Sequence, residues 1–85
     1  MDRDEARELA VAEFTRRMRA RKPRGGFRID DWQVGEPYEE EVRGLRGYQP
    51  CFIVDFVPQG DAEARGYRKL GVAVDPETGA VDVLR

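Results

Sequence analysis

The sequence contains no histidine, no serine and no asparagine, and it has a single cysteine, Cys51. Without histidine, the chain cannot supply a Ser–His or Cys–His nucleophile–base pair or a histidine-based metal site. One cysteine excludes an internal disulfide and a multi-cysteine metal site. We therefore expect a protein that is not an enzyme and that uses no cofactor and no metal.

Long apolar runs are also missing. No stretch approaches the roughly 20 apolar residues that a membrane-spanning helix needs, and the first residues are charged rather than signal-like. The net charge of −2 provides no overall attraction to nucleic acid or to an anionic membrane. A chain of 85 residues is long enough for one core only. We expect a single cytoplasmic domain, residues 1–85, that does not bind membranes.

The final stretch, Lys69–Leu84, has the pattern of a β-hairpin. Two runs of alternating apolar residues flank an Asp-Pro-Glu-Thr-Gly turn that begins at Asp75 and ends at Gly79. Aspartate suits the first position of a type I turn, proline presets φ at the second, and Gly79 supplies the left-handed residue that closes the loop. This turn chemistry predicts the register of the hairpin.

Asp2 to about Arg21 is predicted to form the only helix. Acidic residues near its start and arginines near its end complement the helix dipole. Its apolar residues recur at helical spacing and form one side, which consists of Ala6, Leu9, Ala10, Val11, Phe14 and Met18. The segment Pro23–Gly26, with its proline and two glycines, is expected to terminate the helix.

Phe27–Val34 is a predicted strand with imperfect alternation, because its two halves place their apolar residues on opposite faces. A β-bulge near Asp30 and Asp31 would reconcile the halves by shifting the register by one residue. The next segment, Tyr38–Leu45, fits an edge strand, a short helix or a loop. The residues Gly44, Gly47 and Pro50 indicate a flexible connection after it.

Cys51–Val57 is the strongest strand by composition, and it is apolar on both faces. Phe52, Val54 and Phe56 line one face, whereas Cys51, Ile53, Asp55 and Val57 line the other. Such a strand is central in a sheet or covered by a second layer. The segment after it, Pro58–Gly66, is expected to be a polar loop.

This order of elements predicts the α+β class, with one N-terminal helix packed on a sheet of three or four antiparallel strands in a cystatin-like, two-layer arrangement. A single helix covers one face of the sheet, so one of the two apolar faces of Cys51–Val57 is left without it. Either the segment Tyr38–Pro50 or the partner of a homodimer would close that face. A homodimer could also form through an exposed sheet edge.

Charge is segregated along the chain. Residues 16–28 include seven basic residues and no acidic one, and residues 30–41 include six acidic residues and no basic one. The stretch Arg16–Arg28 is a candidate nucleic-acid-binding segment, although aromatic residues are not interleaved through it. The simpler interpretation is that this block complements the helix dipole and pairs with the acidic segment that follows.

Two further features have a chemical and a structural interpretation. The acidic segment could hold a divalent metal through oxygen ligands, but neighbouring residues on a strand face opposite ways, which favours a solvated surface. Asp55 lies in an apolar strand and must be exposed, protonated or paired, and Arg68 or Arg43 is its expected partner. A catalytic role for Asp55 would need an arginine and a tyrosine in the same pocket.

Cys51 is expected to be a small buried hydrophobe.

Aromatic residues close to arginines form the candidate interaction site. Partly exposed aromatic rings with flanking arginines are typical of protein-interaction hot spots. The residues that we expect to bind a protein or peptide partner are Trp32, Tyr38, Arg43, Arg46 and Tyr48.

The helix sequence Asp-Glu-Ala-Arg-Glu-Leu-Ala (4–10) and the ending Val74-Asp-Pro-Glu-Thr-Gly-Ala-Val81 resemble PepSY-type domains. The same two features are similar to those of YrhB-type bacterial immunity proteins. Both resemblances imply a small α+β domain that binds or inhibits and does not catalyse. We therefore expect a bacterial protein- or peptide-binding module, with an inhibitor or immunity protein as its specific form, and nucleic-acid binding through Arg16–Arg28 as the alternative.

Overall fold

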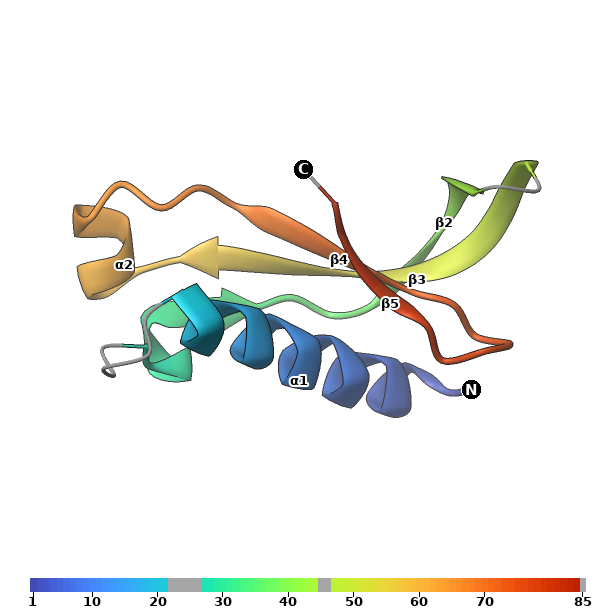
Figure 1. The fold of residues 1–85 in the computed structure, drawn as a ribbon, viewed down its shortest axis with the longest axis horizontal. Coiled ribbons are helices and arrows are strands. Elements are labelled where there is room, and N and C mark those ends of the chain that lie inside the picture. The colour runs from blue at the N-terminus through green and yellow to red at the C-terminus, as the bar shows by residue number, and fades with distance from the viewer. Residues whose placement is uncertain (22–26, 45–46, 85) are drawn as a thin grey trace.

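The computed structural model describes residues 1–21, 27–44 and 47–84. One long helix, α1 (Arg3–Arg21), lies across one face of an antiparallel sheet (Figure 1). Within the described residues the sheet has five strands: β1 (Trp32–Val34), β2 (Tyr38–Gly44), β3 (Gly47–Pro58), β4 (Leu70–Val74) and β5 (Val81–Leu84). The predicted α+β class and two-layer arrangement are confirmed. The sheet exceeds the predicted three or four strands because the segment Tyr38–Leu45, whose structure the sequence left open, forms the strand β2.

Helix α1 begins where Asp2 caps it, since Asp2 Oδ1 accepts a hydrogen bond from the Glu5 backbone N–H at 2.8 Å. Its buried side chains recur every fourth residue and form one stripe along the helix, made of Ala6, Ala10, Phe14 and Met18. Leu9, on the margin of this stripe, stays 36% exposed. The predicted helix and its apolar side are therefore confirmed, with a narrower buried stripe. The predicted terminator, Pro23–Gly26, lies outside the described residues.

The core between α1 and the sheet centres on Phe14. Its ring stacks on Phe56 with a centroid distance of 4.2 Å and meets Trp32 edge to face at 4.8 Å. Phe27 makes a second edge contact at 5.9 Å. The sheet contributes the other large buried side chains of this cluster, Phe52, Val54, Val72 and Val74. Aromatic rings in these geometries add to the stability that burial alone provides.

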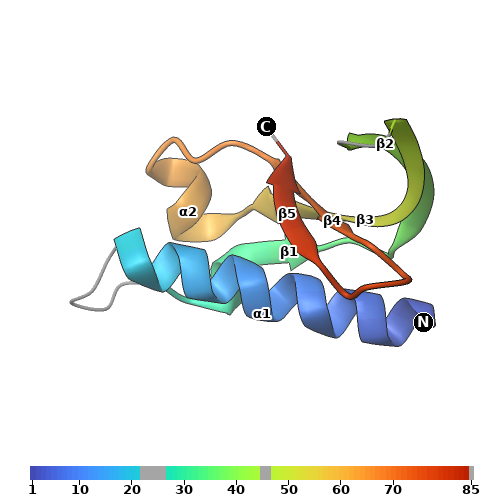
Figure 2. The same cartoon turned by 45° about the vertical axis from the view of Figure 1, so that its right-hand side comes forward.

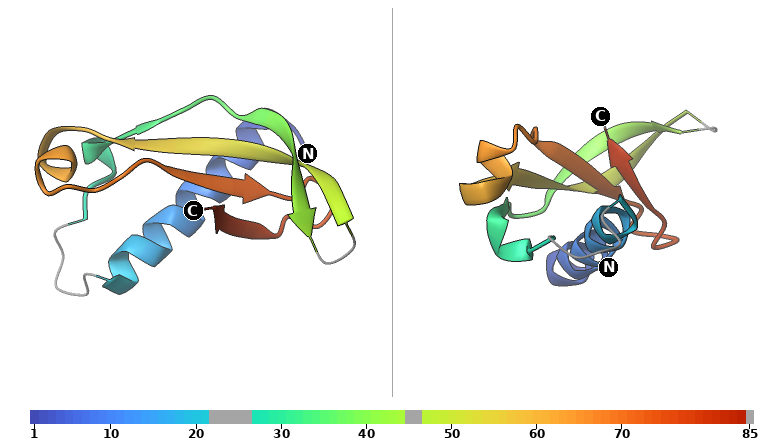
Figure 3. Two further views of the ribbon diagram at one scale, coloured as in Figure 1. Left: turned by 90° about the horizontal axis from the view of Figure 1, so that it is seen from above. Right: turned by 60° about the vertical axis from the view of Figure 1, so that its left-hand side comes forward.

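Strand β3 is the central strand, as its composition predicts. It pairs with β1 and β2 along one edge and with β4 along the other, and β4 in turn pairs with β5. Seen from above, β3 runs through the whole sheet while α1 crosses behind it (Figure 3). Phe52, Val54 and Phe56 face the helix, so the opposite face is the one without a helix.

A β-bulge does shift the register, but at Gly35–Pro37 and not at Asp30–Asp31. Val34 is opposite Phe56 and Tyr38 is opposite Ile53, so three residues of the edge lie against two residues of β3. Proline fits at this point because it has no N–H to donate to a neighbouring strand.

The predicted strand Phe27–Val34 is too long. Ile29–Asp31 forms one 3₁₀ turn, η1, and only Trp32–Val34 is extended. The turn is fastened to the end of β3, where the Gln59 backbone N–H donates to Asp31 O at 2.8 Å. Because the turn rotates the chain, Trp32 joins Phe27 and Ile29 in the same core instead of lying on the opposite face.

Two segments predicted to be irregular have regular structure. The ambiguous segment Tyr38–Leu45 forms the edge strand β2 as far as Gly44, and Gly47 and Pro50 belong to β3. These three residues therefore belong to strands, and residues 45 and 46, which connect the strands, lie outside the described residues. The predicted loop Pro58–Gly66 contains a short helix, α2 (Gly60–Ala64), whose Ala62 packs into the core. Burial of one small side chain thus outweighs the polar character of this segment.

The face without a helix is closed by the sheet itself. Its small cluster consists of Cys51, Ile53 and Ala73, with Val42 of β2 and Leu84 of β5 packed at the sides. Figure 2 shows β2 and the adjoining part of β3 curving round on the side away from α1. Val57, further along β3, remains 37% exposed. The prediction that the Tyr38–Pro50 region helps to close this face is confirmed through Val42.

The closing hairpin is confirmed with its predicted turn. Asp75 Oδ1 accepts a hydrogen bond from the Glu77 backbone N–H at 2.8 Å, and Asp75 O accepts one from the Gly79 N–H at 2.8 Å. Gly79 has a φ of 74°, the left-handed conformation that glycine adopts without strain.

Replacing the central ring tests this packing. We expect Phe14→Ala to lower the free energy of unfolding by about 3–5 kcal/mol, because it removes a fully buried ring and three aromatic contacts. Chemical denaturation measures the change, with Leu9→Ala on the same helix as the control at about 0.5 kcal/mol. Equal losses in both variants would contradict the central role of Phe14.

Candidate functional site

Strand β2 is the longest edge strand of the sheet within the described residues. In the described part of the chain, β2 pairs with β3 alone, so its other side presents unpaired N–H and C=O groups over Tyr38–Gly44. Proteins commonly protect such an edge with charged residues or use it to bind an extended segment of a partner. The seven residues of β2 are enough for either purpose.

This edge is strongly acidic. Glu39, Glu40 and Glu41 are all exposed, and Glu36 precedes them in the bulge. Glu39 and Glu41 lie opposite Phe52 and Pro50 and therefore share one face, whereas Glu40, opposite Cys51, has the other. No group of three or more Cys, Asp or Glu side chains within the described ranges is placed to hold a metal ion.

Within the described residues, no ion pair joins the acidic segment to the basic block. The ion pairs among the described residues join Arg16 and Arg17 to Glu13, Arg17 to Asp82, and Lys69 to Asp55. The two arginines hold the pKa of Glu13 down at about 2, first through the hydrogen bonds from Arg16 and then through that from Arg17. The predicted pairing of the helix end with residues 30–41 is therefore not seen within the part of the chain that is described.

The five predicted interaction residues separate in the structure. Tyr48 is 69% exposed and lies opposite Arg43 across the β2–β3 hairpin, and Tyr38 is 42% exposed at the start of β2. Trp32 is only 4% exposed, because η1 turns its ring into the core, so its expected surface exposure is wrong. Arg46 lies outside the described residues. Tyr38, Arg43 and Tyr48 thus remain beside the acidic edge.

Asp55 occupies the face without a helix, next to Tyr38. Its Oδ2 atom is 3.6 Å from Lys69 Nζ, and Tyr38 Oη donates to Oδ1 at 3.5 Å. Lys69 therefore replaces the predicted partners Arg68 and Arg43. Burial raises the pKa of Tyr38, and the nearby charges of Asp55 and Glu40 raise it further. Sequence reasoning missed Lys69, because its side chain reaches Asp55 only in the register that pairs β3 with β4.

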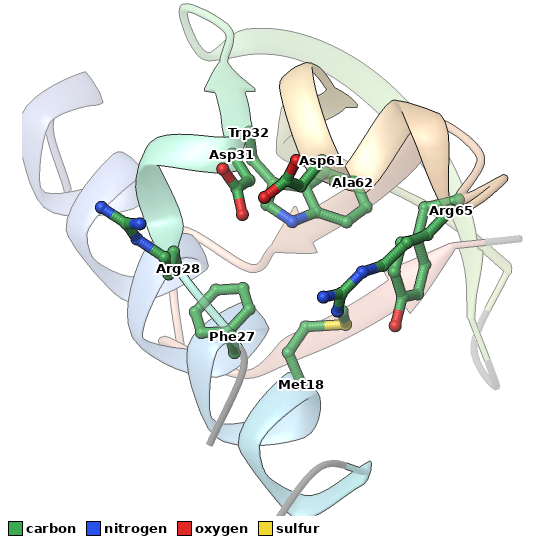
Figure 4. Close-up of a pocket in the computed structure, with 9 residues that line it drawn as sticks. Met18, Phe27, Arg28, Asp31, Trp32, Asp61, Ala62 and Arg65 are labelled. Carbon is green, nitrogen blue, oxygen red and sulfur yellow. The ribbon is translucent and has the colours of Figure 1, made fainter.

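A narrow crevice lies between η1, α2 and the end of α1. Met18, Phe27, Arg28, Asp31, Trp32, Asp61, Ala62, Arg65 and Tyr67 line it (Figure 4). Its volume is about 10 Å³, which is no more than one water molecule occupies. The crevice is therefore a seam between packed elements and has no room for a substrate.

Cys51 is buried on the face without a helix, as its place in an apolar strand predicts. Burial raises the pKa of its thiol, and the charge of Asp75 raises it further. A raised pKa reduces the thiolate fraction at neutral pH and hence the reactivity of the side chain. Cys51 thus serves the packing of the sheet.

The comparisons with known proteins add no relative. No protein-family profile, curated protein or solved structure matches this chain. None of the helices in the described ranges has the length and apolar character that a membrane crossing requires.

The contact between Tyr38 and Asp55 can be measured in solution. We expect Asp55→Asn to lower the pKa of Tyr38, because it removes a negative charge that opposes formation of the phenolate. Carbon-13 NMR of the tyrosine rings during an alkaline titration follows this group separately. Glu63→Gln, an exposed change on α2, should leave the Tyr38 titration unaltered; an identical curve for Asp55→Asn would show that the two groups do not interact.

Proposed function

We propose that this protein is a small, non-catalytic module that binds an extended, basic segment of another protein along strand β2. The observation that carries the proposal is that the unpaired edge of β2 holds Glu39, Glu40 and Glu41 without any ion pair within the described residues. An added strand gains backbone hydrogen bonds from the edge, and its side chains are selected by the charges that they meet.

The register of β2 defines the partner sequence that fits best. In an antiparallel pair, residues directly opposite each other share a face and interact. Basic residues are favoured opposite the three glutamates, and apolar residues opposite Val42 and Tyr38 at the two ends. The preferred segment is therefore apolar–basic–basic–basic–apolar.

The same charges disfavour self-association through this edge. Two copies of β2 paired antiparallel about Glu40 would bring six carboxylates together, and like charges directly opposite each other are destabilising. The edge is thus suited to a basic partner and not to a second copy. The carboxylates of β2 do not bear on the other predicted homodimer, which would form through the face without a helix. That homodimer stays a prediction.

An inhibitory or immunity role is the specific form of this proposal, in which the module covers a basic surface of another protein. The resemblance of α1 and the closing hairpin to PepSY-type and YrhB-type proteins supports this form. The proposal also includes a cytoplasmic location, which the single cysteine favours.

A synthetic peptide tests the proposed strand addition. We expect Thr-Val-Arg-Lys-Arg-Val-Thr to bind in calorimetry and to shift the NMR signals of the β2 amides. The triple variant Glu39→Gln, Glu40→Gln, Glu41→Gln should bind it about tenfold more weakly, because three cross-strand charge pairs are lost. The control variant Glu5→Gln, Glu8→Gln, Glu77→Gln removes as many exposed carboxylates elsewhere and should bind like the wild type.

A second peptide separates strand addition from simple charge attraction. Methylating the peptide nitrogens that face β2 keeps every charge but removes the backbone donors, so binding should be lost. Equal binding by the methylated peptide, or by the triple variant, would overturn the proposed mode.

Nucleic-acid binding through Arg16–Arg28 is the second candidate. The observation in its favour is that Arg19, Arg21 and Arg28 are exposed and form no ion pair within the described residues. If these three arginines contact the phosphates of a single strand, the logarithm of the binding constant should fall with the logarithm of salt concentration with a slope of about −2. Fluorescence anisotropy with a labelled oligonucleotide measures this slope, and no binding at low salt would exclude the candidate.

A further inference from the structure

Asp55, on the central strand β3, has a glycine beside it on each of the two neighbouring segments of the sheet. Gly71 of β4 is its direct partner, and on the other side the Gly35 N–H donates to Asp55 O at 2.8 Å. Neither glycine is among those with positive φ, so the backbone does not require glycine at either position. A Cβ atom on Gly35 would lie 3.4 Å from Asp55 O, and one on Gly71 would lie 3.5 Å from Asp55 Oδ1, so a side chain would fit at both.

Glycine in a sheet often marks a bulge, as Gly35 does here, or a place where a ligand or another chain approaches closely. Here the two glycines place no side chain against Asp55 on either side. Tyr38, at the start of β2, and Lys69, directly before β4, each reach the Asp55 carboxylate from a neighbouring segment. We call the site formed by Gly35, Tyr38, Asp55, Lys69 and Gly71 the Asp55 niche.

The carboxylate in the Asp55 niche is held loosely. The contact from Tyr38 Oη, at 3.5 Å, is at the long limit for a hydrogen bond, and Lys69 Nζ is 3.6 Å away. The Lys69 side chain is 62% exposed, whereas that of Asp55 is only 25% exposed. An exposed ion pair of this kind contributes little stability, so a better cation can displace the lysine.

We propose that the Asp55 niche binds the guanidinium group of an arginine carried by the strand that pairs with β2, an inference that rests on the proposed function. Gly35 lies on the same face of the edge as Tyr38, because the bulge places Glu36 and Pro37 together against Val54. A partner residue two positions after the one opposite Tyr38 therefore lies opposite Gly35. The side chain of this partner residue passes over Gly35, which has no Cβ atom, and reaches Asp55 on the adjacent strand β3.

Arginine suits the niche better than lysine. Its planar guanidinium donates two parallel hydrogen bonds to a carboxylate. The extended arginine side chain and the Asp55 side chain together bridge the two strand spacings of about 4.8 Å each. The ring of Tyr38, whose hydroxyl points at Asp55, offers a face on which the guanidinium can stack. The niche thus extends the preferred partner segment by one specific residue.

A pair of nine-residue peptides tests the inference. Thr-Val-Arg-Lys-Arg-Val-Thr-Arg-Thr carries the arginine at its eighth position, and the second peptide has norleucine there. With the wild-type protein we expect the norleucine peptide to bind about tenfold more weakly, since a charge-assisted hydrogen-bond pair is lost. With Asp55→Asn the two peptides should bind within about twofold of each other. An equal loss from norleucine in both proteins would overturn the proposal.

Two variants report on the niche without removing the carboxylate. Lys69→Met should tighten binding of the arginine peptide by about twofold to threefold, because the competing cation is gone. Gly35→Val should block the approach and weaken that peptide to the level of the norleucine peptide, and chemical denaturation of this variant checks that it stays folded. Unchanged binding in Gly35→Val would contradict the route across Gly35.

A small probe keeps this inference separate from the proposed function. Nα-acetyl-arginine amide does not need the β2 edge, so it should shift the amide NMR signals of Gly35, Asp55 and Gly71 in the wild type but not in Asp55→Asn. If neither peptide binds the wild type, the proposed strand addition is wrong. The amide NMR shifts caused by Nα-acetyl-arginine amide then decide by themselves whether the niche binds a guanidinium. Their absence from the wild type would overturn the inference.

Discussion

The twelve-residue strand β3 is the constraint on which the rest of the structure depends. It is apolar on both faces over Cys51–Phe56, so it must be covered above and below and must be paired on both edges. Helix α1 covers one face through the stack of Phe14 on Phe56. No helix of the described residues covers the other face, and the curved sheet closes it by packing Val42 and Leu84 against Cys51 and Ile53.

This closure explains why the first edge of the sheet is broken. At Trp32 the first edge of the sheet packs beneath α1, and from Tyr38 on it curves away from α1 together with β3 (Figure 2). A single straight strand could not do both. The bulge at Gly35–Pro37 separates the two parts and shifts the register by one residue. As a result Tyr38 lies on the same face as Asp55, and the acidic residues of β2 lie along an edge that nothing in the described part of the chain covers.

The basic end of α1 and the acidic strand β2 do not pair with each other within the described residues. The arginines at the end of α1 interact with Glu13 and Asp82, and the glutamates of β2 have no cationic partner among the described residues. An edge of this kind resists pairing with another copy while it remains open to a basic strand. The proposed function and the proposed niche at Asp55 both follow from this one feature, with the two glycines adding a place for a single long side chain.

The sequence by itself determined the elements that local chemistry controls. The apolar stripe of α1, the two-faced strand at Cys51–Val57 and the Asp75–Gly79 turn each carry a periodicity or a turn signal strong enough to predict. Tyr38, Arg43 and Tyr48 were also predicted as accessible residues. Tertiary structure decided what depends on pairing and burial between distant segments: the 3₁₀ turn that buries Trp32, the place of the bulge, helix α2, and Lys69 as the partner of Asp55. A short segment is neutral enough to adopt several conformations, and the contact that selects one of them lies elsewhere in the chain.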